Sequence, residues 1–116
     1  READIAVFSS PVYYGDTSAQ FKAFFDRTWS QVEVDSSKEL SYSSRIPTGK
    51  TAVFILAQGD SEDKHLDIVE RYSMYFSLYG YDLEVIRATG LTSGAPDADV
   101  SEAQAAAKAL AEELLE

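Results

Sequence analysis

The sequence lacks cysteine and has little histidine, which narrows the chemistry open to this chain. Without cysteine it has no disulfide framework, no thiolate zinc site, no protein-ligated iron–sulfur cluster and no cysteine nucleophile. The only histidine is His65, which gives a Ser-His-Asp triad little support. No apolar run approaches the ~20 residues of a membrane span, and no signal-peptide pattern is present. We therefore expect a cytoplasmic protein with no membrane partner.

Positive charge is also scarce, with 10 basic against 20 acidic residues and a formal net charge of −10. Nucleic acid is not an expected partner, because phosphate backbones require a clustered positive field. The length and the apolar content fit a globular domain, because 45% of the 116 residues are hydrophobic and 12% are aromatic. We expect one domain over residues 1–116.

Alternating apolar and amphipathic segments predict an α/β fold. The expected strands cover about residues 4–9, 51–57 and 83–88, and helices follow each of them. Short loops between such elements indicate parallel strands joined by crossovers. Residues 30–50 are expected to form a long polar surface connection, and Gly94-Ala95-Pro96 a turn. The expected helix caps are Thr17 or Ser18, Asp60 or Ser61, Gly80 with Tyr81 packed behind it, and Ser101 with Gln104.

Two loops follow neighbouring strands of this predicted sheet. Because parallel strands end at the same edge, and ligands bind beyond that edge, these loops are the candidate site. In the first loop, tyrosines offer stacking area and backbone amides offer hydrogen bonds. In the second, Gly59 permits close backbone approach and Gln58 offers an amide. A plain turn and a helix N-cap are the alternatives. The loops are Pro11-Val12-Tyr13-Tyr14-Gly15 and Gln58-Gly59-Asp60-Ser61.

The first strand is as apolar as a central one, yet no segment before it in the sequence could pair with its other edge. Natural proteins usually cover such an edge. We therefore expect a homo-oligomer or a partner chain that pairs with the exposed edge of this strand.

Two motifs resemble the flavodoxin-like NADPH-dependent FMN reductase family, which includes iron–sulfur flavoprotein-type members. They are Ser10-Pro11-Val12-Tyr13 and Phe21-Lys22-Ala23-Phe24-Phe25-Asp26-Arg27. The resemblance implies a three-layer α/β/α fold, of which this chain supplies strands 3-4-5 without the N-terminal β-α-β-α that carries the FMN phosphate loop. It also implies FMN as cofactor and NADPH or NADH as reductant. Without the phosphate loop, we expect this chain alone to bind FMN weakly or not at all. The implied flavin-ring contacts are Pro11, Val12, Tyr13, Tyr14, Gly15, Gln58 and Gly59.

Three functional hypotheses stay open from the sequence. The first is an FMN-binding NAD(P)H oxidoreductase, which needs no acid–base residue because the cofactor carries the chemistry. The second is a non-catalytic module that self-associates through its open sheet edge. The third, a response-regulator-like or hydrolytic domain, requires an acidic pocket or a nucleophile elbow, and neither motif is visible. Asp60, Glu62, Asp63 and His65 are more typical of a helix start than of a metal site.

Overall fold

A parallel sheet forms the centre of the fold in a computed structural model that describes residues 2–35, 41–91 and 99–116. Strands β1 (Ile5–Tyr13), β5 (Thr51–Ala57) and β6 (Asp82–Ala88) lie in the order β1-β5-β6. All three run parallel, with Phe8 opposite Phe54 and Phe54 opposite Val85. The three predicted strands and their neighbour relations are confirmed.

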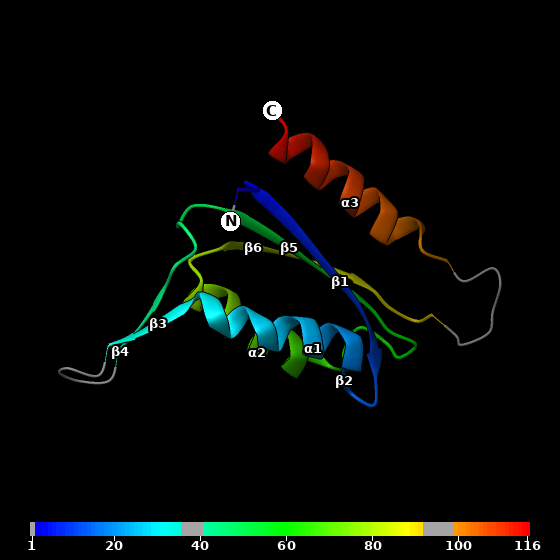
Figure 1. The fold of residues 1–116 in the computed structure, drawn as a ribbon. Coiled ribbons are helices and arrows are strands. Elements are labelled where there is room, and N and C mark those ends of the chain that lie inside the picture. Colours follow the sequence, from blue (N-terminus) through cyan, green and yellow to red (C-terminus); the bar gives the residue numbers. More distant parts are fainter. Residues whose placement is uncertain (1, 36–40, 92–98) are drawn as a thin grey trace.

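Helices lie on both faces of this sheet. Helices α1 (Ala19–Arg27) and α2 (Leu66–Leu78) cover one face, and α3 (Ser101–Leu114) lies on the other (Figure 1). The three-layer α/β/α class is therefore confirmed. In the described part of the chain, no helix is both long and apolar enough to cross a membrane.

The core lies between the sheet and the α1–α2 layer and is built mainly of aromatic rings. Phe54 of β5 is fully buried and stacks on Tyr72 of α2 at a centroid distance of 5.0 Å. Phe25 of α1 meets the same tyrosine edge-on at 5.1 Å. Such ring pairs add to the stabilisation from apolar burial. The continuously apolar β5 is covered on both faces, as its sequence predicts.

Two helix termini follow the predicted capping chemistry. The Ser18 hydroxyl accepts a hydrogen bond from the Phe21 amide and caps α1. At the end of α2, Gly80 adopts φ 73°, and the Tyr81 amide donates to the Phe76 carbonyl, as in a Schellman motif.

The predicted caps of the other two helix starts are wrong. Helix α2 begins after His65, and the His65 side chain makes no capping hydrogen bond. The predicted caps Asp60 and Ser61 lie too early in the sequence, because they belong to a longer loop before the helix. Helix α3 begins after Val100, and Ser101 bonds to the Asp99 carboxylate instead of capping the helix.

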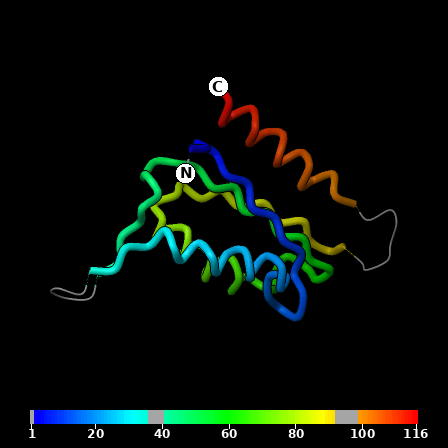
Figure 2. The backbone as a smooth tube through the Cα atoms, viewed as in Figure 1, coloured from blue at the N-terminus to red at the C-terminus, as the bar shows by residue number. Residues whose placement is uncertain are grey.

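The connection predicted for residues 30–50 contains structure that the sequence reading missed. A 3₁₀ turn, η1 (Thr28–Gln31), leads into an antiparallel pair of β3 (Val32–Asp35) and β4 (Ser41–Ser44). Val32 is buried, and Trp29 packs against Tyr42 at 5.8 Å, which anchors the pair to the body. Figure 2 shows this pair extending away from the sheet. The predicted turn Gly94-Ala95-Pro96 lies outside the described residues.

Candidate functional site

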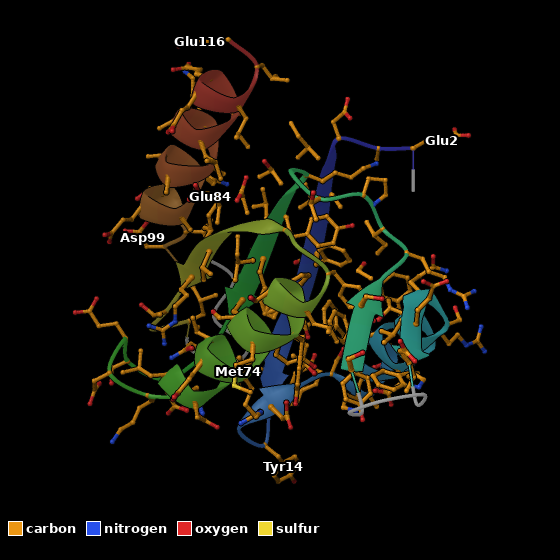
Figure 3. All side chains as sticks on the ribbon, turned by 90° about the vertical axis from the view of Figure 1, so that its left-hand side faces the viewer. Glu2, Tyr14, Met74, Glu84, Asp99 and Glu116 are labelled. Atoms are coloured by element: carbon orange, nitrogen blue, oxygen red, sulfur yellow. The ribbon has the colours of Figure 1, made fainter. Side chains whose placement is uncertain are left out.

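β1 runs further than the sequence predicts and ends in a hairpin at the carboxyl edge of the sheet. The strand continues to Tyr13 and pairs antiparallel with the short β2 (Asp16–Thr17). The turn residues Tyr14 and Gly15 have φ of 49° and 74°, the left-handed values of a type I′ turn. This turn keeps the strands paired, so residues 11–13 are strand and not open loop. The Tyr14 ring at the tip projects into solvent (Figure 3).

Side chains of α2 hold this hairpin in place. Arg71 donates to Asp16 at 3.1 Å and to Asp67 at 2.6 Å. The hydrogen bond between Arg71 and Asp67 lowers the pKa of the carboxyl group and raises that of the guanidinium group. The Tyr72 hydroxyl lies 3.1 Å from the Thr17 hydroxyl in a buried contact. The hairpin is therefore a supported element.

A buried serine fixes the connection from β1 to α1. The Ser10 hydroxyl accepts from the Ser18 amide at 2.9 Å and donates to the Pro11 carbonyl at 2.8 Å. Ser18 in turn caps α1. Sequence reasoning placed Ser10 in a family motif without giving it a role. Its positioning function emerges only from these contacts.

The loop after β5, residues 58–65, is organised from within by Gln58 and Arg87. The Gln58 amide nitrogen donates to the carbonyls of Ser61 at 2.8 Å and Lys64 at 3.2 Å. Its amide oxygen accepts from Arg87 at 3.1 Å, and Arg87 also donates to the Glu62 and Lys64 carbonyls at 2.8 and 2.7 Å. Because these bonds engage the buried Gln58 side chain, it orders the loop and is not free to bond a ligand.

Gly59 is required by a neighbouring backbone segment. A Cβ atom at this position would lie 3.0 Å from the Leu91 carbonyl oxygen. The same segment is tied to the loop by bonds from the Leu91 amide to the Gln58 carbonyl and from the Gly90 amide to the Asp60 carbonyl. The close approach inferred for Gly59 is therefore to the chain's own backbone.

The two candidate loops meet at His65. A Cβ atom built on Gly15 would lie 3.7 Å from the Nδ1 atom of His65, so the hairpin turn rests on this ring. On its other side, His65 Nε2 lies 2.6 Å from an Asp60 carboxylate oxygen. His65 itself is held in a left-handed conformation with φ 62°. The chain's only histidine thus bridges the two loops, a role that its position in the sequence did not reveal.

A comparison with protein families gives this geometry a context. A model described as flavodoxin-like fold matches residues 1–114. The chain belongs to the flavodoxin-like fold family. Proteins of this family commonly bind flavin. No curated protein gives a significant match.

The basic side chains near the carboxyl edge of this flavodoxin-like chain already have partners. Arg71 pairs with two acids, Arg87 binds loop carbonyls, and Lys64 Nζ lies 3.9 Å from Asp63. Acidic side chains of the β1–β2 hairpin and of the 58–65 loop add negative charge to this edge. Within the described ranges, no cluster of three or more acidic or histidine side chains is arranged to hold a metal ion. The edge therefore offers little attraction for an anionic group.

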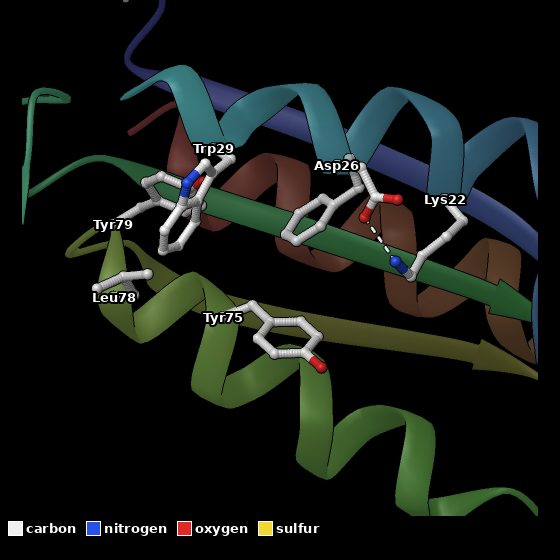
Figure 4. Close-up of a pocket in the computed structure, with 7 residues that line it drawn as sticks. Lys22, Asp26, Trp29, Tyr75, Leu78 and Tyr79 are labelled. Atoms are coloured by element: carbon white, nitrogen blue, oxygen red, sulfur yellow. Dashed lines mark hydrogen bonds and ion pairs between the residues drawn. The ribbon is translucent and has the colours of Figure 1, made fainter. Parts of the chain in front are cut away.

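A cavity of about 420 Å³ lies between α1 and α2, and none of the predicted site residues lines it (Figure 4). The Lys22 amine and the Asp26 carboxylate, one helical turn apart on α1, form an ion pair at 2.5 Å on the cavity rim. The hydrogen bond to Asp26 raises the pKa of Lys22, so the amine stays charged and paired. Apart from Lys22 and Asp26, the side chains that line the cavity are aromatic or aliphatic: Phe25, Trp29, Tyr75, Leu78 and Tyr79.

Tyr72 makes the stability of this flavodoxin-like chain sensitive to alkali. Burial raises the pKa of its hydroxyl above the ordinary value of 10.0. The folded state therefore favours the neutral phenol, and this contribution is complete below about pH 10 and is lost as the pH rises through the folded pKa. We expect Tyr72→Phe to flatten the fall in unfolding free energy above about pH 10, measured by urea titrations.

Thr17→Val is the matched control for this prediction. Both substitutions remove the hydrogen bond between the Thr17 and Tyr72 hydroxyls, which costs about 1 kcal/mol at neutral pH, but Thr17→Val keeps the buried phenol of Tyr72. The alkaline fall should therefore persist in Thr17→Val. An unchanged alkaline slope in Tyr72→Phe would contradict the assignment.

Proposed function

We propose that this chain contributes the ring-contacting part of a flavin site and acts as an FMN-dependent NAD(P)H oxidoreductase. The observation that carries the proposal is the meeting of the β1–β2 hairpin and the 58–65 loop at the carboxyl edge of the sheet. In open α/β sheets, ligands bind beyond this edge. The resemblance to FMN reductases supports the same position for the flavin ring.

The described residues suit the flat ring of a flavin. Tyr13 and Tyr14 expose their rings at the hairpin, so stacking requires no core side chain to move. The backbone of Pro11, Val12 and Gly15 lies in the same hairpin. In this proposal Gln58 and Gly59 act by holding the second loop in shape, since the Gln58 amide is engaged internally.

The same residues do not suit a phosphate group. The bases near this edge are paired with acids or carbonyls, and the chain carries a net charge of −10. The part of the site described here should therefore recognise the ring and not the phosphate, and its affinity for FMN alone should be low. Bound flavin would supply two-electron redox chemistry with a nicotinamide donor, while the chain's own residues orient the ring.

Fluorescence titration with two flavins tests this proposal. We expect riboflavin to bind at least as tightly as FMN, because the FMN phosphate gains no partner from the described residues. Tyr14→Ala should weaken riboflavin binding roughly 2–10-fold through loss of stacking. Tyr42→Ala removes another exposed tyrosine, on β4, and should leave the affinity unchanged.

Two results would contradict the proposal. If riboflavin does not bind at any accessible concentration, the chain has no site for the flavin ring. An equal loss of affinity in Tyr14→Ala and Tyr42→Ala would show that the hairpin is not the contact.

A further inference from the structure

His65 has an unusual backbone conformation at the point where the two loops of the proposed flavin site meet. Its φ of 62° lies in the left-handed region, which residues other than glycine adopt only where the surrounding structure holds them. The residue precedes the first turn of α2, but its side chain does not cap the helix. The imidazole instead lies between the 58–65 loop and the β1–β2 hairpin.

The two nitrogen atoms of this ring face different loops. Nε2 lies 2.6 Å from a carboxylate oxygen of Asp60 in the 58–65 loop. Nδ1 is the atom nearest to the hairpin turn, 3.7 Å from a Cβ atom built on Gly15. The side chain is only 22% exposed, as expected of a ring held between two segments. A change in the charge of this ring therefore acts on both loops at once.

The surroundings of His65 are acidic. The charged groups that the loop, the hairpin and the start of α2 place around it are Asp60, Asp63, Lys64, Asp16, Asp67 and Arg71. Arg71 pairs with Asp16 and Asp67, and Lys64 Nζ lies 3.9 Å from Asp63. The hydrogen bond with Arg71 is the main cause of the lowered pKa of Asp67, and the charge of His65 adds to it. Four acids therefore face two bases, and a positive charge on His65 offsets part of the excess.

We propose that His65 is a positioning residue for the flavin ring, and that its protonation tightens the contact between the hairpin and the 58–65 loop. This inference rests on the proposed function, because it concerns the same ring surface. Neutral imidazole carries one proton, which the contact between Nε2 and Asp60 uses. The imidazolium ion binds Asp60 through a charge-assisted hydrogen bond and attracts the acids of the hairpin and of α2. Histidine side chains change charge between about pH 5 and 8, so the affinity for flavin should fall as the pH rises through this range.

Riboflavin titrations between about pH 5 and 8 test this proposal, and the uncharged ligand leaves the protein as the titrating partner. The wild-type affinity should fall about 2–5-fold from the lower to the upper pH, the effect of one partly exposed ion pair. His65→Asn should bind with the same affinity at every pH, because asparagine tolerates a left-handed φ and does not titrate. Asp60→Asn keeps an acceptor for Nε2 but removes the charge, so it should weaken the pH dependence.

Asp82→Asn is the matched control, since it makes the same change at an exposed position at the start of β6. It should leave the pH dependence as it is in the wild type. Circular dichroism verifies folding at each pH, and Asp60→Asn decides alone if His65→Asn does not fold. A purely structural role for His65 would lower the affinity by the same factor at every pH.

The ligand-free chain gives a second readout that does not depend on flavin. The amide signal of Gly15 should shift with the same midpoint as the ring signals of His65, the chain's only histidine, and less in Asp60→Asn. Wild-type affinity that does not change with pH, or a Gly15 signal that does not follow His65, would overturn the proposal and leave the flavin site standing. A chain that binds no riboflavin at any pH would contradict the proposed function instead, and the Gly15 signal would still decide whether the two loops are coupled.

Discussion

Phe54→Ala is expected to unfold most of the protein or to lower its free energy of unfolding by about 3–5 kcal/mol. Phe54 lies on β5 with no exposed surface and contacts Phe21, Tyr72 and Phe76 at centroid distances of 5.6, 5.0 and 5.6 Å. Removing its ring leaves a cavity between the sheet and both helices of one layer. Domains are typically stable by only about 5–15 kcal/mol, so the loss is a large fraction of the total.

Urea unfolding monitored by circular dichroism measures this effect. Met74→Ala on α2 is the control, because it deletes a large apolar side chain that is exposed to solvent. Its effect should stay within about 0.5 kcal/mol. Equal losses for the two variants would contradict the location of the core.

Gln58→Leu is expected to lower the free energy of unfolding by about 2–4 kcal/mol and to loosen the 58–65 loop. Leucine has a similar volume but cannot donate to the Ser61 and Lys64 carbonyls or accept from Arg87. The guanidinium group then loses one acceptor, and its Nε is already buried without a partner. Leaving such groups unsatisfied costs more than the net value of the bonds themselves.

Limited digestion with trypsin reports the loosening directly, since Lys64 provides a cleavage site within the loop. Cleavage after Lys64 should be faster in Gln58→Leu, and riboflavin binding should weaken with it. Gln104→Leu, at an exposed position of α3, should change neither stability nor cleavage. Wild-type stability and cleavage in Gln58→Leu would show that the amide network does not order the loop.

The sequence predicted the sheet and its helices well because their signals are local. The apolar run of β5 predicts its burial, and the i, i+3, i+4, i+7 spacing of Phe21, Phe24, Phe25 and Thr28 predicts the inner face of α1. Phe21 and Phe25 are buried, whereas Phe24 is 54% exposed. The N-cap at Ser18 and the left-handed Gly80 depend on one or two residues, so they could also be predicted.

The candidate site was predicted less completely because its contacts join residues distant in sequence. The Tyr14-Gly15 turn looked like an open loop, since tyrosine is rare at left-handed φ and the two-residue β2 leaves almost no strand pattern. The internal use of Gln58 depends on Arg87, which lies on another strand. The sequence signal for that network is a glutamine placed directly after the continuously apolar run 51–57.

The central claim is that the β1–β2 hairpin and the 58–65 loop form a single flavin-ring surface. Amide chemical shifts of the ¹⁵N-labelled chain during a riboflavin titration test it most directly. We predict that the largest changes fall on Tyr13, Tyr14, Gly15, Gly59 and His65, with one shared saturation curve. Changes confined to the cavity between α1 and α2, around Trp29 and Tyr75, would contradict the claim.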